Sequence, residues 1–164
     1  MLSQISDFCY WPSTQTVFDN YAIKMVKRLD EQCSHHMTAL ELQVSKVSNV
    51  IDGALTAHSI TLYQMCSPID LIMAETTFAL IELCETLLTE SPIPSTSSPI
   101  LVHCQTGSKK SAVFISLLSL IQQIRCDKRV DVFQTARTTK MQRRSTFQSF
   151  VSFLASLSFF VALL

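Results

Sequence analysis

The sequence predicts an α/β domain, and three patterns along the chain support this. Residues 21–26 and 40–45 alternate in polarity with a period of two, which is typical of strands. Residues 71–90 and 111–124 carry apolar side chains at helical spacing. Between these two segments, a short β-branched run at 100–102 leads into a loop that begins with a cysteine. With 48% hydrophobic and 16% charged residues in a chain of 164, the composition favours one folded domain and excludes disorder.

The first half of the chain is expected to form antiparallel strands. In 40–45, three apolar side chains point to one face and three polar ones to the other. Residues 27–36 are polar and are expected to connect the two strands, and 59–63 is a further candidate strand. His35 and His36 lie in that connection without a nearby carboxylate pattern, so no metal site is predicted.

The second half is expected to be mainly helical. Residues 71–90 have an apolar stripe with glutamates opposite; the stripe comprises Leu80, Leu83, Cys84 and Leu87, and the glutamates are Glu75, Glu82 and Glu85. Prolines and serines then interrupt regular structure at 91–99, which predicts a surface loop. Residues 111–124 are apolar almost all round, as in a buried helix, and 137–144 predicts a basic helix.

The loop that begins at Cys104 has the features of an anion cradle. Where a strand turns sharply into a helix, backbone N–H groups point into one concavity and the helix N-terminus adds positive potential. Such a site favours both a dianion and a thiolate. Gly107, one of only two glycines, is expected to need a positive φ or a close backbone approach. The alternative is that Cys104 is a small buried apolar residue at a strand end.

The residues of this loop resemble a known signature. His103, Cys104, Gly107 and Ser111 match the pattern of the protein tyrosine phosphatases, which has His-Cys, five residues, Arg and then Ser or Thr. Further landmarks follow in the family's order: Tyr10-Trp11-Pro12, the run Val130-Asp131-Val132-Phe133-Gln134-Thr135, Gln142-Arg143, and Phe147-Gln148-Ser149. The resemblance covers about residues 10–153.

This resemblance implies a tyrosine-phosphatase-like α/β fold, with a mixed, twisted sheet flanked by helices and no cofactor. The family's domain is longer at its N-terminal side, and its Lys-Asn-Arg-Tyr recognition loop has no counterpart here. We therefore expect residues 1–164 to form a single partial domain that corresponds to the C-terminal portion and is truncated at its N-terminal side.

The resemblance also implies roles for individual residues. Cys104 is in the position of the nucleophile, with Ser111 beside it, and Gln148 in that of the water-positioning glutamine. The phosphate-binding positions are His103, Gln105, Thr106, Gly107, Ser108 and Lys109.

Two positions depart from the family pattern. Lys110 stands where the family has the arginine that holds the phosphoryl group, and an ammonium supplies charge but no bidentate fork. Residues 60–68 take the place of the loop that carries the family's general-acid Asp, with Met65 near the Asp position, and Asp70 lies beyond Pro68. A side chain such as Met65 cannot donate a proton.

These departures favour a catalytically impaired phosphatase domain that acts as an interaction or regulatory module, similar to the membrane-distal second domains of receptor-type tyrosine phosphatases. The expected partner is a phosphotyrosine-containing protein or another phosphatase domain, in the cytoplasm, and a nucleic-acid partner is not expected. Two alternatives remain open: an active phosphatase that forms a phosphocysteine at Cys104, and a structural loop that holds no ligand.

Charge and cysteine usage add two expectations. Residues 101–164 hold 9 basic and 2 acidic side chains, a net charge of +7, which would attract acidic or phosphorylated partners; a solvated basic face with no ligand is an equally open alternative. The six cysteines form no C-x-x-C pair, so neither zinc nor a disulfide framework is predicted. Residues 145–164 carry no charge and follow two arginines; we favour a packed apolar helix there over a membrane anchor.

Overall fold

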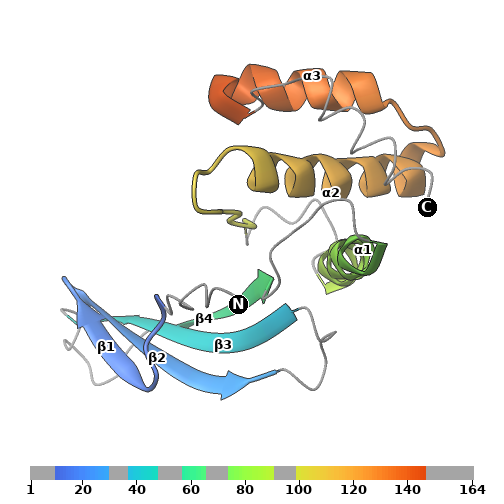
Figure 1. The fold of residues 1–164 in the computed structure, drawn as a ribbon. Coiled ribbons are helices and arrows are strands. Elements are labelled where there is room, and N and C mark those ends of the chain that lie inside the picture. The colour runs from blue at the N-terminus through green and yellow to red at the C-terminus, as the bar shows by residue number, and fades with distance from the viewer. Residues whose placement is uncertain (1–9, 30–36, 48–56, 66–73, 91–98, 147–164) are drawn as a thin grey trace, which may run out of the picture. The chain divides into compact units, whose positions relative to one another are not determined.

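The computed structural model describes residues 10–29, 37–47, 57–65, 74–90 and 99–146. The chain divides into two compact units, Met1–Pro68 and Ile69–Leu164. The first unit contains a sheet and the second contains helices, and each is described by itself (Figure 1).

The first unit is a four-stranded sheet in which neighbours along the chain are neighbours in space, in the order β1-β2-β3-β4. All three strand pairs are antiparallel. The strands are β1 (Gln15–Phe18), β2 (Tyr21–Arg28), β3 (Met37–Lys46) and β4 (Ala57–Met65). The strands expected at 21–26, 40–45 and 59–63 are therefore confirmed, and each is longer than its alternating core.

Strand β1 was not predicted, although the residues Asp19 and Asn20 that follow it are typical of a turn. Phe18 pairs with Tyr21, so Asp19 and Asn20 form a two-residue turn, and Asp19 has a φ of 53°. Asp and Asn tolerate this left-handed region better than most residues. The hairpin therefore begins one strand earlier than the polarity pattern indicates.

The apolar residues of β3 are buried on both faces at its start. Ala39 and Leu40, which point to opposite faces, are each 1% exposed, while Leu42 and Val44 are half-buried. Of the three polar residues predicted to face solvent, Gln43 is exposed, whereas Glu41 and Ser45 are half-buried like Leu42 and Val44. The predicted division into one buried and one polar face is therefore not observed along β3.

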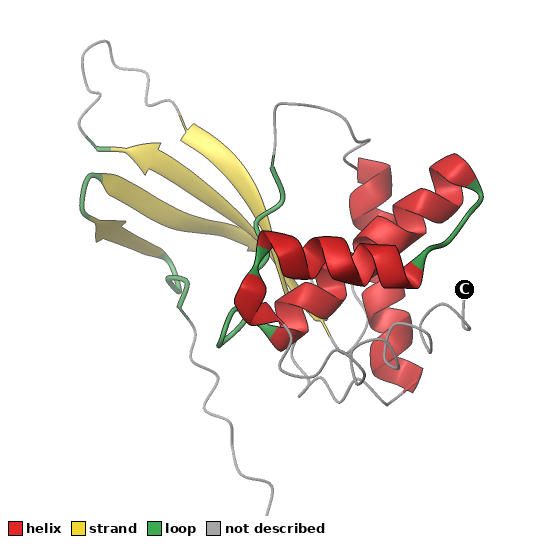
Figure 2. Ribbon diagram, turned by 90° about the horizontal axis from the view of Figure 1, so that it is seen from above, coloured by secondary structure: helices red, strands yellow, loops and turns green. Residues whose placement is uncertain are grey.

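The second unit contains three α-helices, α1 (Ala74–Glu90), α2 (Lys109–Asp127) and α3 (Val132–Gln142), followed by the short 3₁₀ helix η2 (Arg144–Thr146). In Figure 1, α1 is viewed nearly end-on, whereas α2 and α3 are viewed from the side, so α1 crosses the other two. Figure 2 shows the same three helices from above.

Helix α2 supplies half of the buried hydrophobic residues described in this unit, and α1 supplies most of the others. Leu117 and Leu120 are fully buried, as is Cys84 of α1. The other members of this core are Ala79, Leu80, Leu83, Ala112, Val113, Ile121 and Ala136. The predictions of a buried helix at 111–124 and of an apolar stripe on 71–90 are thus confirmed.

Polar contacts fix α3 alongside α2 in the opposite direction. Gln123 Nε2 donates to Thr135 Oγ1 over 3.0 Å, near the end of α2 and the start of α3. Ser116 Oγ and Thr139 Oγ1 are 3.1 Å apart, near the start of α2 and the end of α3. The C-terminal end of α3 therefore lies beside the N-terminal end of α2.

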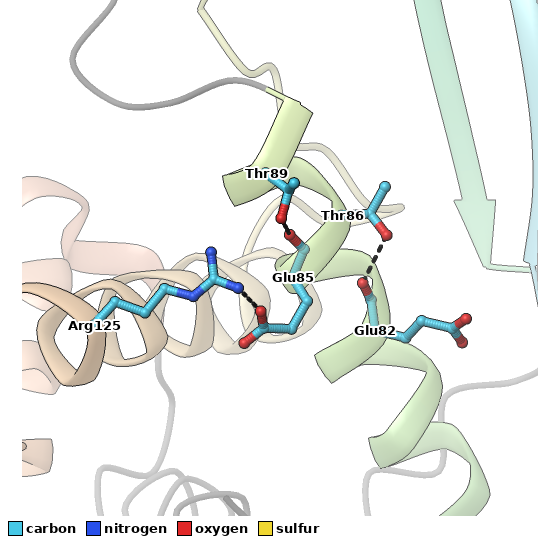
Figure 3. Close-up of polar contacts among 5 residues, drawn as sticks. All are labelled: Glu82, Glu85, Thr86, Thr89 and Arg125. Carbon is cyan, nitrogen blue, oxygen red and sulfur yellow. Dashed lines mark hydrogen bonds and ion pairs between the residues drawn. The ribbon is translucent and has the colours of Figure 1, made fainter.

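Helix α1 contacts α2 through an ion pair between Glu85 and Arg125 (Figure 3). Both side chains are about two-fifths exposed, so this pair contributes little to stability. On α1 itself, Thr86 and Thr89 donate to the carbonyl oxygens of Glu82 and Glu85 over 2.9 and 2.8 Å.

The basic helix begins earlier than predicted, at Val132 rather than 137. The side chain of Asp131 accepts a hydrogen bond from the Gln134 amide over 2.8 Å and so caps the helix. Lys128, with a φ of 53°, ends α2 in the left-handed conformation. The connection between α2 and α3 is consequently short.

The strand expected at 100–102 is not formed, because no described strand pairs with these residues. Leu101 is 89% exposed. The described sheet is accordingly antiparallel throughout and not mixed. The tail predicted at 145–164 lies mostly outside the described residues, since only Ser145 and Thr146 are placed. No helix among the described residues has the length and apolar character needed to cross a membrane.

Candidate functional site

The loop from Cys104 to Ser108 turns the chain into helix α2. The Gly107 amide donates to the Cys104 carbonyl over 3.1 Å, which closes a tight turn. Gly107 has a φ of 62°, a region that costs other residues free energy. The positive φ expected at this glycine is confirmed.

The N-terminus of α2 has no side-chain cap. Ser108 occupies the N-cap position, but its hydroxyl makes no capping hydrogen bond and instead lies 3.1 Å from Thr106 Oγ1. No acidic residue lies in the first turn of the helix. The positive end of a 19-residue helix is therefore presented to the loop without a carboxylate to neutralise it.

The Cys104 thiol is the centre of the loop's hydrogen bonds. Partial burial raises its pKa, but hydrogen bonds from the Ser111 hydroxyl and from the amides of Ser111, Ser108 and Thr106 outweigh this. Together they lower the pKa of Cys104 from 9.0 to about 7. The sulfur thus lies close to the backbone donors of Thr106, Ser108 and Ser111 at a helix start, and the lowered pKa favours its thiolate form.

Ser111 supports the same sulfur from inside the helix. Its side chain is 6% exposed, and its hydroxyl has no partner at conventional hydrogen-bond geometry. The acceptor that this hydroxyl faces is Cys104, whose pKa it lowers. A buried hydroxyl directed at a thiol is better satisfied by the thiolate than by the neutral form.

The remaining predicted positions are more open. Lys110 is exposed, as are His103, Gln105 and Thr106, whereas Gly107 and Ser108 are half-buried. The side chain of Lys109 and the whole of Gln148 lie outside the described residues. The structure therefore brings Cys104, Ser111 and the loop amides together, while Lys110 lies exposed at the start of α2.

Arg143 reaches the loop from the end of α3, and its position was not predicted. A Cβ atom placed on Gly107 would lie 2.7 Å from Arg143 Nη2 and 3.3 Å from Cζ. The Arg143 amide also ends α3 by donating to the Thr139 carbonyl over 3.1 Å. Gly107 is thus required for two reasons, its positive φ and the guanidinium against it. The sequence places Arg143 in a basic helix but does not show which residue it contacts.

A comparison with known families shows to which family the chain belongs. The sequence model of the family described as "Protein-tyrosine phosphatase" matches residues 3–161. The chain belongs to the protein-tyrosine phosphatase family. This confirms the resemblance inferred from the loop and the landmarks that follow it.

The relatives that this chain matches are tyrosine-protein phosphatases, and two of the three described below are named as receptor-type. It is 27% identical over 161 residues to Tyrosine-protein phosphatase 69D of Drosophila melanogaster, an alignment that covers 93% of this chain and 11% of the relative. It is 33% identical over 84 residues to a receptor-type tyrosine-protein phosphatase of Caenorhabditis elegans, covering 51% and 6%. It is 25% identical over 140 residues to mouse receptor-type tyrosine-protein phosphatase F, covering 85% and 7%. The chain therefore spans about a tenth or less of each relative's length.

The segment predicted to take the place of the general-acid loop has a different local structure than expected. Residues 60–65, placed by the resemblance in the general-acid loop, form the second half of strand β4. Met65 pairs with Met37 and Gln64 with Thr38 in the antiparallel ladder. Residues 66–68 and Asp70 lie outside the described residues. The Met65 side chain is consequently carried by a strand and not by a loop.

Proposed function

We propose that this chain is a tyrosine-phosphatase domain that binds a phosphorylated group at the Cys104 loop but turns it over slowly, and that it acts as an interaction or regulatory module. One contrast carries the proposal: the loop keeps its amide donors and its low-pKa thiol, while an exposed lysine stands in the arginine position. The partner would be a phosphotyrosine-containing protein or another phosphatase domain, in the cytoplasm as part of a receptor.

Binding of an oxyanion is supported by groups that do not depend on Lys110. The uncapped N-terminus of α2 and the inward-facing loop amides offer partial positive charge and directed donors. Lys110 and Arg143 add full charges next to this loop. These features support a phosphoryl group over an apolar ligand.

Turnover requires transition-state stabilisation and a general acid in addition to binding. A guanidinium fork tightens on the equatorial oxygens as charge develops, and losing one such stabilising donor costs roughly 3 to 4 kcal/mol, about a thousandfold in rate. Met65 cannot protonate a leaving phenolate, and a missing general acid costs a further hundredfold to ten-thousandfold, roughly. Both departures reduce rate while leaving ground-state binding largely intact.

An active phosphatase is the second candidate, and the pKa of Cys104 favours it. A thiol with a pKa of about 7 is substantially ionised at neutral pH and can attack phosphorus. In this candidate Lys110 substitutes for the arginine, and the reaction passes through a phosphocysteine at Cys104.

One set of variants separates the two candidates. Turnover of a phosphotyrosine peptide is measured for the wild type, Lys110→Arg and Cys104→Ser, with Lys128→Arg as a matched control at the far end of α2. We expect slow wild-type turnover, acceleration of at least about tenfold in Lys110→Arg, and peptide binding that survives in Cys104→Ser.

A wild-type rate within the ordinary enzymatic range of about 1 to 10³ s⁻¹, abolished by Cys104→Ser, would reject the impaired domain in favour of the active enzyme. If neither the peptide nor inorganic phosphate binds, the loop is structural and the proposal fails.

A further inference from the structure

A buried serine interrupts the apolar side chains by which α2 packs in the core. Ser116 is 0% exposed and precedes Leu117, which is also fully buried. A hydroxyl in such a place costs free energy unless it is hydrogen-bonded. Its partner is Thr139 of α3, whose Oγ1 lies 3.1 Å from Ser116 Oγ. The pair therefore gives the helix contact a direction, which apolar packing alone does not supply.

The donor in this hydrogen bond follows from a second bond that Thr139 makes. A hydroxyl carries a single proton, and Thr139 donates its proton to the Thr135 carbonyl over 3.0 Å. Ser116 is therefore the donor and Thr139 Oγ1 the acceptor of the bond between the helices. The Thr139 side chain is consequently held by one bond along α3 and by another from α2.

Thr139 is also the residue on which α3 ends. Its carbonyl accepts a hydrogen bond from the Arg143 amide over 3.1 Å. The Arg143 guanidinium lies so close to Gly107 that a Cβ there would be 2.7 Å from Nη2. The hydrogen bond from Ser116 to Thr139 therefore lies one helical turn from the residue that α3 places against the Cys104 loop.

We propose that Ser116 and Thr139 are positioning residues for the Cys104 loop, because their hydrogen bond fixes the register of α3 on α2 and so holds Arg143 against Gly107. Buried polar pairs between helices specify register, since the bond weakens once its atoms move beyond about 3.2 Å. The effect on phosphate binding rests on the proposed function, whereas the position of Arg143 does not.

The position of Arg143 affects the loop in two ways. Its guanidinium is a full positive charge beside an anion cradle, so its withdrawal weakens the binding of a phosphoryl group. It also fills the space next to Gly107. The amides on either side of that glycine, those of Thr106 and Ser108, donate to Cys104. A shift of α3 along α2 would therefore change both the charge and the packing around these donors.

The test compares Thr139→Val with Thr135→Val as its matched control. Both threonines lie on α3, and each hydroxyl bonds to a side chain of α2. Valine has nearly the shape of threonine and lacks the hydroxyl. Thr135, however, accepts from Gln123 at the opposite end of the helix pair. The two variants therefore remove similar contacts at different distances from Arg143.

The first measurement combines each valine variant with Gly107→Ala and determines the unfolding equilibrium constant in urea. The added Cβ meets the Arg143 guanidinium, so its effect should be at least about threefold smaller in Thr139→Val, where that side chain is no longer held. In Thr135→Val, the effects of the two substitutions should multiply independently. Independent effects in Thr139→Val would overturn the proposal.

The second measurement is the affinity for a fluorescent phosphotyrosine peptide, by anisotropy, under conditions where every variant is folded. Thr139→Val should bind about three- to tenfold more weakly than the wild type, and Thr135→Val within about twofold of it. Thr139→Ser keeps the hydroxyl and should bind like the wild type. If Thr139→Val does not fold, Ser116→Ala replaces it in both measurements, because Thr139 then still donates to Thr135 and no donor is left unpaired.

Equal weakening of peptide binding in Thr135→Val and Thr139→Val overturns the positioning role, since the cause is then a general loosening of the helix pair. Unchanged affinity in Thr139→Val, with a wild type that binds, overturns it as well. If the wild type binds no phosphotyrosine peptide, the proposed function fails. The dependence of the Gly107→Ala effect on Thr139 then decides by itself whether the pair holds Arg143.

Discussion

Cys84 and Cys104 belong to the same unit and carry the same thiol group, but they differ in burial and in pKa. Cys84 is completely buried in the core face of α1, and burial raises its pKa to about 12. Cys104 is also partly desolvated, which raises its pKa, but the hydroxyl of Ser111 and the amides of Ser111, Ser108 and Thr106 lower it to about 7. Local hydrogen bonding, and not residue type, therefore decides which thiol becomes an anion.

The largest expected difference between the two is in reactivity. The pKa of Cys104 is lowered to about 7 and that of Cys84 is raised to about 12, so at pH 7 the thiolate, which is the nucleophile, is formed far more readily at Cys104. Iodoacetamide should therefore alkylate Cys104 long before Cys84, as followed by peptide mass spectrometry. Cys126, which is exposed, serves as the internal reference for access. Alkylation of Cys84 at a rate comparable with Cys104 would break the comparison.

Replacement by serine should affect stability more at Cys84 than at Cys104. Cys84→Ser places a hydroxyl in an apolar site and should lower the free energy of unfolding by about 1–3 kcal/mol. Cys104→Ser should change it by less than about 0.5 kcal/mol at pH 6, since the hydroxyl can use the loop donors. Urea denaturation of both variants at pH 6 measures this, and equal losses would contradict it.

Gly107→Ala tests whether backbone geometry sets the pKa of Cys104. The added Cβ meets Arg143 Nη2 and forces a side chain to a φ of 62°, so we expect a loss of about 1–2 kcal/mol and a pKa of Cys104 that rises toward 9. Thiolate absorbance at 240 nm against pH reports the pKa.

The double variant Gly107→Ala/Arg143→Ala is the control for that prediction. It should recover the part of the loss that is due to the guanidinium and retain the part that is due to φ. An unchanged pKa in the single variant would show that the loop amides do not depend on this turn.

Ser111→Ala should act on the thiol more than on the fold. Removing the hydroxyl takes away the largest of the influences that lower the pKa of Cys104, so that pKa should rise, while the three amides keep it below 9. The melting temperature at pH 6 should hardly change, because the Ser111 hydroxyl makes no conventional hydrogen bond, so its removal leaves no oxygen or nitrogen atom without a partner. Ser119→Ala, on the same helix and bonded only to the Ile115 carbonyl among the described hydrogen bonds, should leave the pKa as it is.

The two thiols contribute to the pH dependence of stability with opposite signs. The pKa of Cys104 is depressed in the folded state, so between about pH 7 and 9 the unfolded chain holds the extra proton and stability rises with pH. The pKa of Cys84 is raised, so above about pH 9 the folded chain holds the proton and stability falls. Cys104→Ser should remove the rise and Cys84→Ser the fall, measured by urea denaturation across this pH range.

Much of the fold follows from side-chain periodicity. The apolar stripe of residues 71–90 and the nearly uniform apolarity of 111–124 correspond to α1 and α2, because burial of those faces is what stabilises the helices. The strand expected at 100–102 is not formed, because a strand exists only where another strand pairs with it, and composition does not show whether a partner is present.

The site was predictable to the extent that it is local in sequence. Cys104, Gly107 and Ser111 lie within eight residues, so turn and helix geometry bring them together. Arg143 comes from another helix, and its contact with Gly107 depends on how α3 packs against α2, which no local pattern specifies. Strand β4 likewise extends to Met65 because its partner β3 reaches Met37.

The N-cap of α2 has a consequence for the lifetime of that helix. Ser108 directs its hydroxyl to Thr106 instead of to the first turn, so the amides there have no side-chain acceptor from the N-cap. An arriving oxyanion would provide that acceptor, so the helix start should open less often, and its amide protons exchange more slowly with deuterated water, when the loop is occupied.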